Sequence, residues 1–196
     1  MLIRRAIPAD ASAVAEIYAH YVRHTAVTFA TEPPTPADYA ARMADVRFPF
    51  LVAENEGRVM GFVYAAPFRT KEAYRWDVEL TIYLVPGQEG RGTGSALMEV
   101  CLQCLTAQGF LNAYSCITLP NERSVGLHRR FGFRELGIFP GTGYKLGKWH
   151  DVIWMGKVLG SFDHAPEETK PVPEVWEMWN EESCPCSSPA SARSCW

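Results

Sequence analysis

The sequence lacks the features of several protein classes. No apolar run approaches the roughly 18 residues of a membrane-spanning helix. The N-terminus has no long apolar segment behind its charges, so a signal peptide is not expected. No basic cluster stands out and the formal charge is −3, which argues against nucleic acid as a partner. We therefore expect a cytoplasmic protein that binds neither nucleic acid nor membrane.

Metal-binding patterns are missing as well. Cys101, Cys104 and Cys116 lie in apolar segments without His or Cys companions at zinc-like spacing. We expect buried thiols in a reducing compartment, and no metal site. Three more cysteines near the C-terminus could bind a metal or pair, although free thiols are the favoured interpretation: Cys184, Cys186 and Cys195.

The chain does contain a glycine-dense turn between a strand and a helix. Residues 78–85 are rich in β-branched and aromatic residues and predict a strand. Residues 95–105 carry apolar residues at helical spacing, and Gly109 is a plausible helix end. The turn between them reads Glu89-Gly90-Arg91-Gly92-Thr93-Gly94. Backbone amides at a helix start favour an anion, usually phosphate.

Two common phosphate motifs do not fit this turn. The dinucleotide fingerprint G-x-G-x-x-G fails because its third glycine would fall on Ser95 or Leu97. The Gly-Lys-Ser/Thr triplet of a Walker loop is absent from the sequence. What remains is x-x-x-G-x-G at a strand-to-helix junction, and a glycine-rich turn without a ligand is the alternative interpretation.

The order of the predicted elements indicates an α+β fold with a mixed, largely antiparallel twisted sheet and helices on both faces. In order, we expect a strand (2–6), a helix capped by Asp10, a helix (37–46) capped by Thr35, a hairpin (50–65), the central strand and helix, a strand (111–119), a helix opened by Asn121, and final strands (134–157).

The composition changes at residue 161. Residues 1–160 hold 17 basic and 15 acidic residues, whereas residues 161–196 hold 2 and 7 and are rich in Pro, Ser and Cys. We expect one domain over residues 1–160. Residues 161–196 should form an acidic tail, extended or disordered, with a short amphipathic patch around Val175 and Trp176.

Several further blocks accompany the glycine turn in a consistent order. They are Ala73 to Glu79, Asn121 to His128, Gly132-Phe133, and Gly143 to Val152. Together with the turn, these blocks resemble the phosphinothricin / methionine sulfoximine N-acetyltransferases of the GNAT superfamily, over roughly residues 2–158. The resemblance implies a GNAT-like fold and acetyl transfer from acetyl-CoA to the α-amine of a small amino-acid analogue. It also implies a homodimer. Glu89 departs from the Gln or Arg that the superfamily prefers in its pyrophosphate loop.

Glu79 is the candidate general base. A strand rises about 3.3 Å per residue, so a cofactor lying along it can reach from the glycine turn to Glu79. An amine must lose a proton before it attacks a thioester, and a carboxylate accepts that proton directly or through water. The resemblance places the family's catalytic glutamate at Glu79, and a solvent-facing strand residue is the alternative.

His128 is the second catalytic candidate. The resemblance aligns it with a helix position where many GNAT enzymes have a tyrosine that protonates the departing CoA thiolate. Histidine titrates near neutral pH, so it can act as an acid or as part of a proton relay. The alternative is a partly buried histidine that is hydrogen-bonded to the backbone.

The resemblance also implies binding residues. For acetyl-CoA these are the backbone groups of Ile82, Tyr83 and Leu84, the loop Gly90, Arg91, Gly92, Thr93, Gly94 and Ser95, and the side chains of Asn121 and Arg130. For the acceptor they are Phe68, Glu72, Ala73, Tyr74, Arg75 and Tyr144. Arg75 is the first candidate for the substrate's carboxylate, and Arg69 and Lys71 are weaker candidates.

Two other functions stay open from the sequence. One is a GNAT enzyme for a different amine, such as a peptide N-terminus, an aminoglycoside or a polyamine. The other is a non-catalytic acetyl-CoA-binding module whose acidic tail recruits a partner, which Glu89 and the unusual tail would support.

Overall fold

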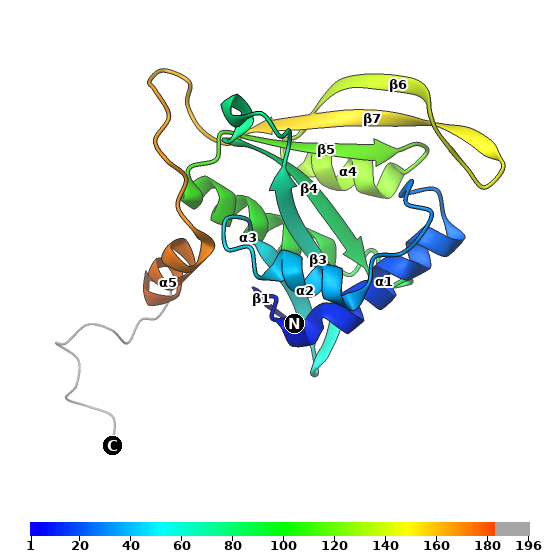
Figure 1. The fold of residues 1–196 in the computed structure, drawn as a ribbon, viewed down its shortest axis with the longest axis horizontal. Coiled ribbons are helices and arrows are strands. Elements are labelled where there is room, and N and C mark those ends of the chain that lie inside the picture. Colours follow the sequence, from blue (N-terminus) through cyan, green and yellow to red (C-terminus); the bar gives the residue numbers. More distant parts are fainter. Residues whose placement is uncertain (183–196) are drawn as a thin grey trace.

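The computed structural model describes residues 1–182, and their centre is a sheet of seven strands (Figure 1). Its spatial order is β1-β2-β3-β4-β5-β7-β6. Within the described residues every neighbouring pair is antiparallel except β4 and β5, which are parallel. The strands are β1 Leu2–Arg5, β2 Phe50–Asn55, β3 Arg58–Pro67, β4 Asp77–Leu84, β5 Asn112–Thr118, β6 Arg134–Lys145 and β7 Lys148–Val158. The predicted α+β fold with a mixed sheet is confirmed.

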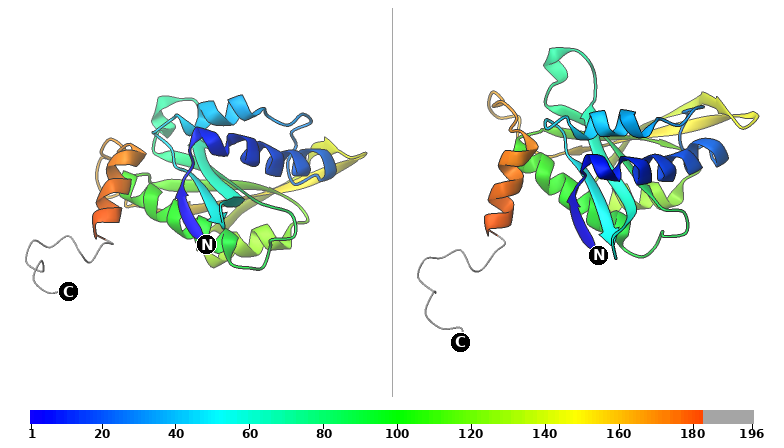
Figure 2. Two further views of the ribbon diagram at one scale, coloured as in Figure 1. Left: turned by 90° about the horizontal axis from the view of Figure 1, so that it is seen from below. Right: turned by 60° about the horizontal axis from the view of Figure 1, so that its bottom comes forward.

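Helices cover both faces of this sheet, as expected (Figure 2). α1 (Ala11–His24) and α2 (Pro36–Met43) lie on one face, and α3 (Thr93–Gln108) and α4 (Glu122–Arg130) lie on the other. Short 3₁₀ turns occupy Pro8–Asp10 and Glu72–Tyr74. In residues 1–182 no helix is long and apolar enough to cross a membrane.

Local signals explain where the helices begin. The Thr35 hydroxyl accepts from the Asp38 amide and Pro36 opens α2, as the sequence predicts. Asp10 differs from its prediction, because its side chain does not cap α1. Its carboxylate instead accepts from the Arg4 guanidinium at 2.7 and 2.9 Å and from the Ile7 amide at 2.8 Å. This ion pair lowers the pKa of the Asp10 carboxyl.

Side chains of β4 alternate between two apolar cores. Val78, Leu80 and Ile82 face the core beneath α3 and α4, whereas Tyr83 packs in the core beneath α1 and α2. Side chains two residues apart share a face of a strand, so Glu79 lies on the same face as Tyr83. The strand therefore presents its carboxylate toward α1 and its apolar residues toward α3.

β4 and β5 pair over a short stretch and then separate. Their register holds three residue pairs, from Asp77 opposite Asn112 to Glu79 opposite Tyr114. Beyond Glu79 the edge of β4 that faces β5 has no strand partner among the seven described strands, while its other edge stays paired with β3 as far as Leu84. The sheet thus opens into a gap at the point where Glu79 stands.

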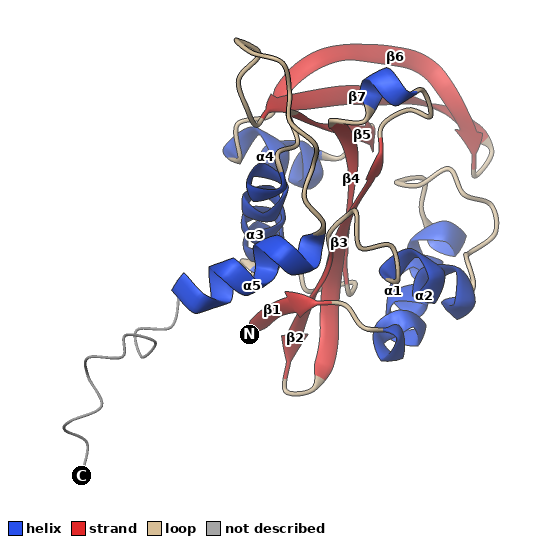
Figure 3. Ribbon diagram, turned by 60° about the vertical axis from the view of Figure 1, so that its left-hand side comes forward, coloured by secondary structure: helices blue, strands red, loops and turns tan. Residues whose placement is uncertain are grey.

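The segment after residue 160 differs from the expected extended tail. Residues Val172–Glu182 form a helix, α5, and Figure 3 shows it beside α3. Val172 and Val175 are buried with Cys104 of α3. The Gln108 side chain donates to the carbonyl oxygens of Arg47 and Lys170, at 2.9 and 2.7 Å. The apolar residues of the predicted amphipathic patch thus fold onto the domain. Cys184, Cys186 and Cys195 lie outside the described residues.

Candidate active site

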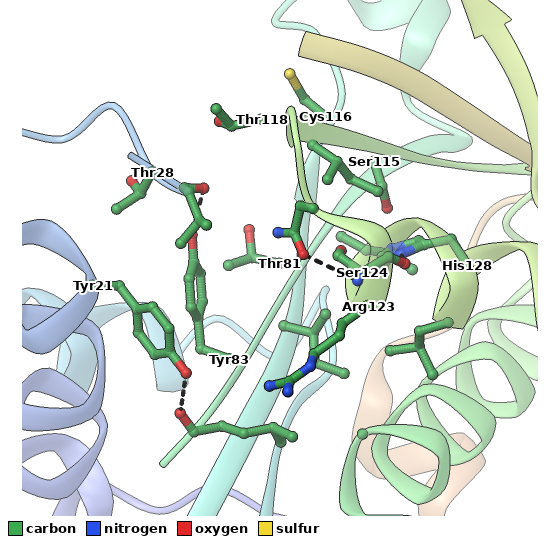
Figure 4. Close-up of a pocket in the computed structure, with 18 of the residues that line it drawn as sticks. Tyr21, Thr28, Thr81, Tyr83, Ser115, Cys116, Thr118, Arg123, Ser124 and His128 are labelled. Atoms are coloured by element: carbon green, nitrogen blue, oxygen red, sulfur yellow. Dashed lines mark hydrogen bonds between the residues drawn. The ribbon is translucent and has the colours of Figure 1, made fainter. Parts of the chain in front are cut away.

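The gap between β4 and β5 opens into a cavity of about 850 Å³ (Figure 4). Its walls come from α1 and the loop after it, from β4, from the glycine loop, from β5 and from α4. Most of the predicted catalytic and cofactor residues line it: Glu79, Ile82, Tyr83, Leu84, Gly90, Gly92, Gly94, Ser95, Asn121, His128 and Arg130. The structure therefore brings together residues that are up to 51 positions apart, from 79 to 130.

One end of the cavity is the glycine loop before α3. Gly90 and Gly92 have φ values of +77° and +86°, which other residues adopt only with strain. α3 begins directly after Gly92, so the first amides of the helix face outward without helical partners. Positive dipole and free amides together suit a phosphate. Arg91 and Thr93 belong to this loop but do not line the cavity.

The open edge of β4 forms the middle of the cavity. Phe68 donates to the Asp77 carbonyl and Val85 donates to the Met60 carbonyl, so the backbone groups of the odd-numbered residues of β4 face β3. The groups of Ile82 and Leu84 consequently face the gap. Those of Tyr83 do not, which corrects the expectation for its backbone. The Leu84 carbonyl already accepts from the Tyr21 hydroxyl at 2.7 Å.

Glu79 stands where the pairing of β4 with β5 ends. Partial burial raises the pKa of its carboxyl, and the positive charge of Arg69 opposes that rise. A carboxyl with a raised pKa accepts a proton more readily than an exposed one does. The geometry thus supports the predicted role of a base, because the side chain lies on the cavity wall and is half-buried.

Cys116 differs from its prediction as a core residue. It is exposed and lines the cavity, since it lies on the face of β5 opposite to that of Ala113 and Ile117. Partial burial and the charge of Glu79 raise the pKa of its thiol to about 11. The thiol is therefore protonated near neutral pH, and a protonated thiol is a poor nucleophile. Cys101 and Cys104 are buried, as predicted.

His128 lies on the other side of the gap from Glu79. α4 packs on the α3 face of the sheet, and His128 is buried against Phe133 with ring centroids 5.0 Å apart. Its Nδ1 lies 2.8 Å from the Ser124 carbonyl oxygen, which can only accept. Nδ1 therefore carries a hydrogen, and burial lowers the pKa of the ring. A neutral ring with Nδ1–H has only a lone pair at Nε2, so Nε2 holds no proton to donate to the cavity. The geometry therefore favours a role in a proton relay over that of a general acid.

Asn121 can cap α4 and contact a bound molecule at the same time. Its Oδ1 accepts from the Ser124 amide at 3.1 Å and caps α4. The same side chain lines the cavity, where its amide nitrogen remains a donor. A helix cap and a ligand contact are therefore compatible in one residue.

The structure does not bring the predicted acceptor residues to the cavity wall: Phe68, Glu72, Ala73, Tyr74, Arg75 and Tyr144 are absent from it. Arg75 instead pairs with Glu168 at 2.9 Å and lies over the Trp76 ring. Sequence reasoning could not foresee this partner because it comes from the segment expected to be extended. Arg69, the weaker candidate, is the guanidinium whose charge reaches Glu79.

Two neighbouring residues on the β6–β7 hairpin differ in their environment. Tyr144 is 61% exposed and packs against Trp149, itself exposed. Lys145 is buried and donates to the Thr28 carbonyl at 2.7 Å. Thr28 lines the cavity, so it is Lys145 that supports the cavity wall.

Sequence reasoning missed several residues of the wall. Tyr18 and Thr28, joined by a hydrogen bond of 2.6 Å, form part of it, as do Ser115 and Arg123. Arg123 lies 3.5 Å from the Glu89 carboxylate, so the unusual acidic residue of the loop has a cationic partner. Ser115 carried a usable signal, since it is a polar residue between Ala113 and Ile117 on the buried face of a strand.

Comparison with known proteins identifies the family. Residues 3–154 match the family model described as an acetyltransferase (GNAT) domain. The chain belongs to the GNAT acetyltransferases. As a GNAT protein it is similar to phosphinothricin N-acetyltransferase of Streptomyces viridochromogenes, with 40% identity over 176 residues, which cover 88% of this chain and 95% of that protein. It is also similar to the L-methionine sulfoximine/L-methionine sulfone acetyltransferase of Pseudomonas aeruginosa, with 34% identity over 171 residues, 84% of this chain and 98% of that protein.

Solved GNAT structures show the same fold. A phosphinothricin acetyltransferase from Sinorhizobium meliloti, in complex with acetyl-CoA, matches with a TM-score of 0.81 and 36% identity, over 85% of this chain and 93% of that one. An acetyltransferase from Salmonella typhimurium with acetyl-CoA matches with a TM-score of 0.81 and 30% identity, over 85% and 97%. The predicted GNAT fold and the resemblance to this family are confirmed.

Proposed function

We propose that the protein transfers the acetyl group of acetyl-CoA to the α-amine of a small amino-acid analogue of the phosphinothricin or methionine sulfoximine type. The observation that carries this proposal is the continuous cavity from the glycine loop, along the open edge of β4, to Glu79. The names of the relatives support the choice of acceptor.

Three groups of residues would hold the cofactor. The amides at Gly90 to Ser95 suit its pyrophosphate, because they combine a helix start with open space beside Gly90 and Gly92. The backbone groups of Ile82 and Leu84 that face the gap suit the amides of its pantetheine arm as an added strand would. The Asn121 amide nitrogen adds a donor. Acetyl-CoA, when bound, supplies an acetyl group activated as a thioester.

Glu79 would act as the general base for direct attack by the amine. Its side chain lies on the α1 face of the gap, so the acceptor enters between β4 and the loop that carries Thr28. Removal of the ammonium proton by Glu79 frees the lone pair that attacks. A covalent acetyl-enzyme is not needed, and the high pKa of the Cys116 thiol speaks against that residue as a nucleophile.

Arg69 would bind the carboxylate of the acceptor. It is exposed, and within residues 1–182 it makes no salt bridge, whereas Arg75 is engaged with Glu168. Its guanidinium lies 4.0 Å from the centre of the Phe68 ring and acts on the charge of Glu79. An amino acid that bridges Arg69 and Glu79 would present its amine to the base and its carboxylate to the cation.

The protein would work as a homodimer in the cytoplasm. Large apolar side chains are exposed along β6 and β7, among them Leu136, Phe139 and Trp149. Such a concentration is typical of an interface rather than of a solvent-facing ribbon. Sedimentation velocity should give a dimer, and Phe139→Glu should give a monomer. A monomer at every concentration of the wild-type protein would contradict the pairing.

The acceptor is tested by a panel assay that follows release of the free thiol of CoA. Phosphinothricin, methionine sulfoximine and methionine sulfone should support turnover well above a peptide N-terminus, an aminoglycoside or a polyamine. Faster turnover with one of the latter group would replace the proposed acceptor. Binding of acetyl-CoA without turnover on any amine would instead support a non-catalytic module.

A further inference from the structure

Two polar atoms in the wall of the cavity have no hydrogen-bond partner within residues 1–182. They are the hydroxyl oxygen of Ser115 and Nε2 of His128, and each residue is 2% exposed. A buried polar group without a partner keeps the cost of leaving water, so few persist in native folds. Two in one cavity indicate that a bound molecule completes their bonding. Ser115 has no part in the function proposed above.

Both atoms belong to the same side of the gap. Ser115 shares its face of β5 with Ala113 and Ile117, which pack in the core beneath α3 and α4. Figure 4 shows Ser115 above the ring of His128, both at the cavity. Glu79 lies on the opposite face of the sheet. A cofactor that crosses the gap would therefore place its leaving group beside Ser115 and its acetyl carbon toward Glu79.

The two atoms are chemically complementary. Because Nδ1 of His128 is bound to the Ser124 carbonyl, Nε2 of the neutral ring accepts, while the Ser115 hydroxyl can donate. One group that satisfies both must accept from the hydroxyl and donate to the ring. A thiol does this, since its sulfur accepts and its S–H donates.

We propose that Ser115 is a further catalytic residue, whose hydroxyl donates a hydrogen bond to the sulfur of the cofactor. The proposal rests on the function proposed above. As the amine nitrogen bonds to the acetyl carbon, the C–S bond breaks and its electron pair stays on sulfur. Glu79 takes the first proton from the ammonium group, and the second proton that the nitrogen loses becomes the S–H proton. Ser115 keeps its own proton and stabilises the growing negative charge, and His128 Nε2 accepts from the S–H that results.

Calorimetric binding of CoA and of desulfo-CoA tests the contact without any acceptor. The wild-type protein should bind CoA more tightly than the analogue that lacks the thiol, by about 2- to 10-fold for each of the two hydrogen bonds lost. Ser115→Ala should reduce that difference by weakening CoA alone, because the bond from the thiol to His128 Nε2 remains. Ser115→Thr keeps the hydroxyl and should restore it.

Steady-state kinetics test the catalytic part. Ser115→Ala should lower kcat about 10- to 100-fold, the range of a hydrogen bond to a charged group, with a much smaller change in KM for acetyl-CoA. Its Tm should be unchanged or higher, because an unpartnered hydroxyl is removed. Thr106→Ala is the control, since that hydroxyl bonds to the Leu102 carbonyl outside the cavity. Should Ser115→Ala fail to fold, Ser115→Cys keeps a similar volume and, as a weak donor, should show the same loss.

The outcomes separate this proposal from the proposed function. Full kcat in Ser115→Ala, together with unchanged discrimination against desulfo-CoA, would overturn the role of Ser115 and leave the acetyltransferase activity in place. Absence of acetyl-CoA binding by the wild-type protein would overturn both.

Discussion

The carboxyl group of Glu79 is the titratable group that stands in the cavity at the end of the paired stretch of β4. If it removes the proton of the amine, Glu79→Gln should lower kcat about 10²- to 10⁴-fold, the range for loss of a general base. Affinity for acetyl-CoA should stay nearly intact, because the pyrophosphate and pantetheine contacts lie elsewhere. Glu135→Gln, on exposed β6, is the control. Unchanged turnover of Glu79→Gln would remove the proposed role.

The pH dependence follows from the raised pKa of the same residue. Glu79 must be ionised to accept a proton, so activity is lost as the pH falls through its pKa. Since burial raises that pKa, the acid limb of kcat should lie above the ordinary range of an exposed glutamate, near 4.3. Removing the opposing charge with Arg69→Ala should move the midpoint to a higher pH, whatever happens to the maximal rate. A midpoint that moves down would contradict this assignment.

At the residue scale, the type and position of the main candidate site residues could be predicted from the sequence, but the orientation of their side chains could not. The family resemblance points to Glu79, His128 and Asn121, and all three line the cavity. The tautomer of His128 follows from its hydrogen bond to the Ser124 carbonyl. Arg75 lies away from the cavity wall and pairs with Glu168. Neither contact can be predicted from local composition, because both depend on how the folded chain packs.

At the scale of elements, the glycine loop gives a matched pair of tests. Gly87 and Gly92 both have positive φ, +82° and +86°, with open space where a Cβ would lie, and only Gly92 of the two lines the cavity. Alanine at either position should cost about 1–2 kcal/mol of unfolding free energy. Gly92→Ala should also weaken acetyl-CoA binding, because it redirects amides at the start of α3, whereas Gly87→Ala should not. Equal binding by both variants in calorimetry would contradict a phosphate site here.

The order of helices and strands up to β7 was predictable because these elements carry local signals. The hairpin at Asn55 to Arg58 has positive φ at Glu56 and Gly57, as its sequence predicts. The separation of β4 from β5 was not predictable from the pattern of either strand, since each sequence predicts one continuous strand. The resemblance implies a backbone contact from Tyr83, whereas the register of β3 and β4 turns the backbone groups of Tyr83 toward β3.

At the scale of the whole molecule, α5 makes the chain after residue 160 part of the domain. Val175→Ser should lower the unfolding free energy by about 2 kcal/mol, the cost of a truncated and polar side chain in a packed site. For a chain of this size that corresponds to a fall in Tm of roughly 4–8 °C. Affinity for acetyl-CoA should not change, and Val158→Ser, at an exposed position, should leave Tm nearly unaltered. A Tm of Val175→Ser equal to that of the wild type would show that α5 adds nothing to stability.

In the proposed reaction the sheet separates two chemical tasks, with the amine on the Glu79 side of the gap and the sulfur on the side of His128 and Ser115. A crystal structure of the ternary complex with CoA and phosphinothricin measures this directly. We expect the amine nitrogen within hydrogen-bond reach of Glu79, directly or through one water, and the sulfur beside Ser115 on the opposite face. An amine bound on the His128 side, or a diphosphate away from the amides of residues 90–95, would contradict it.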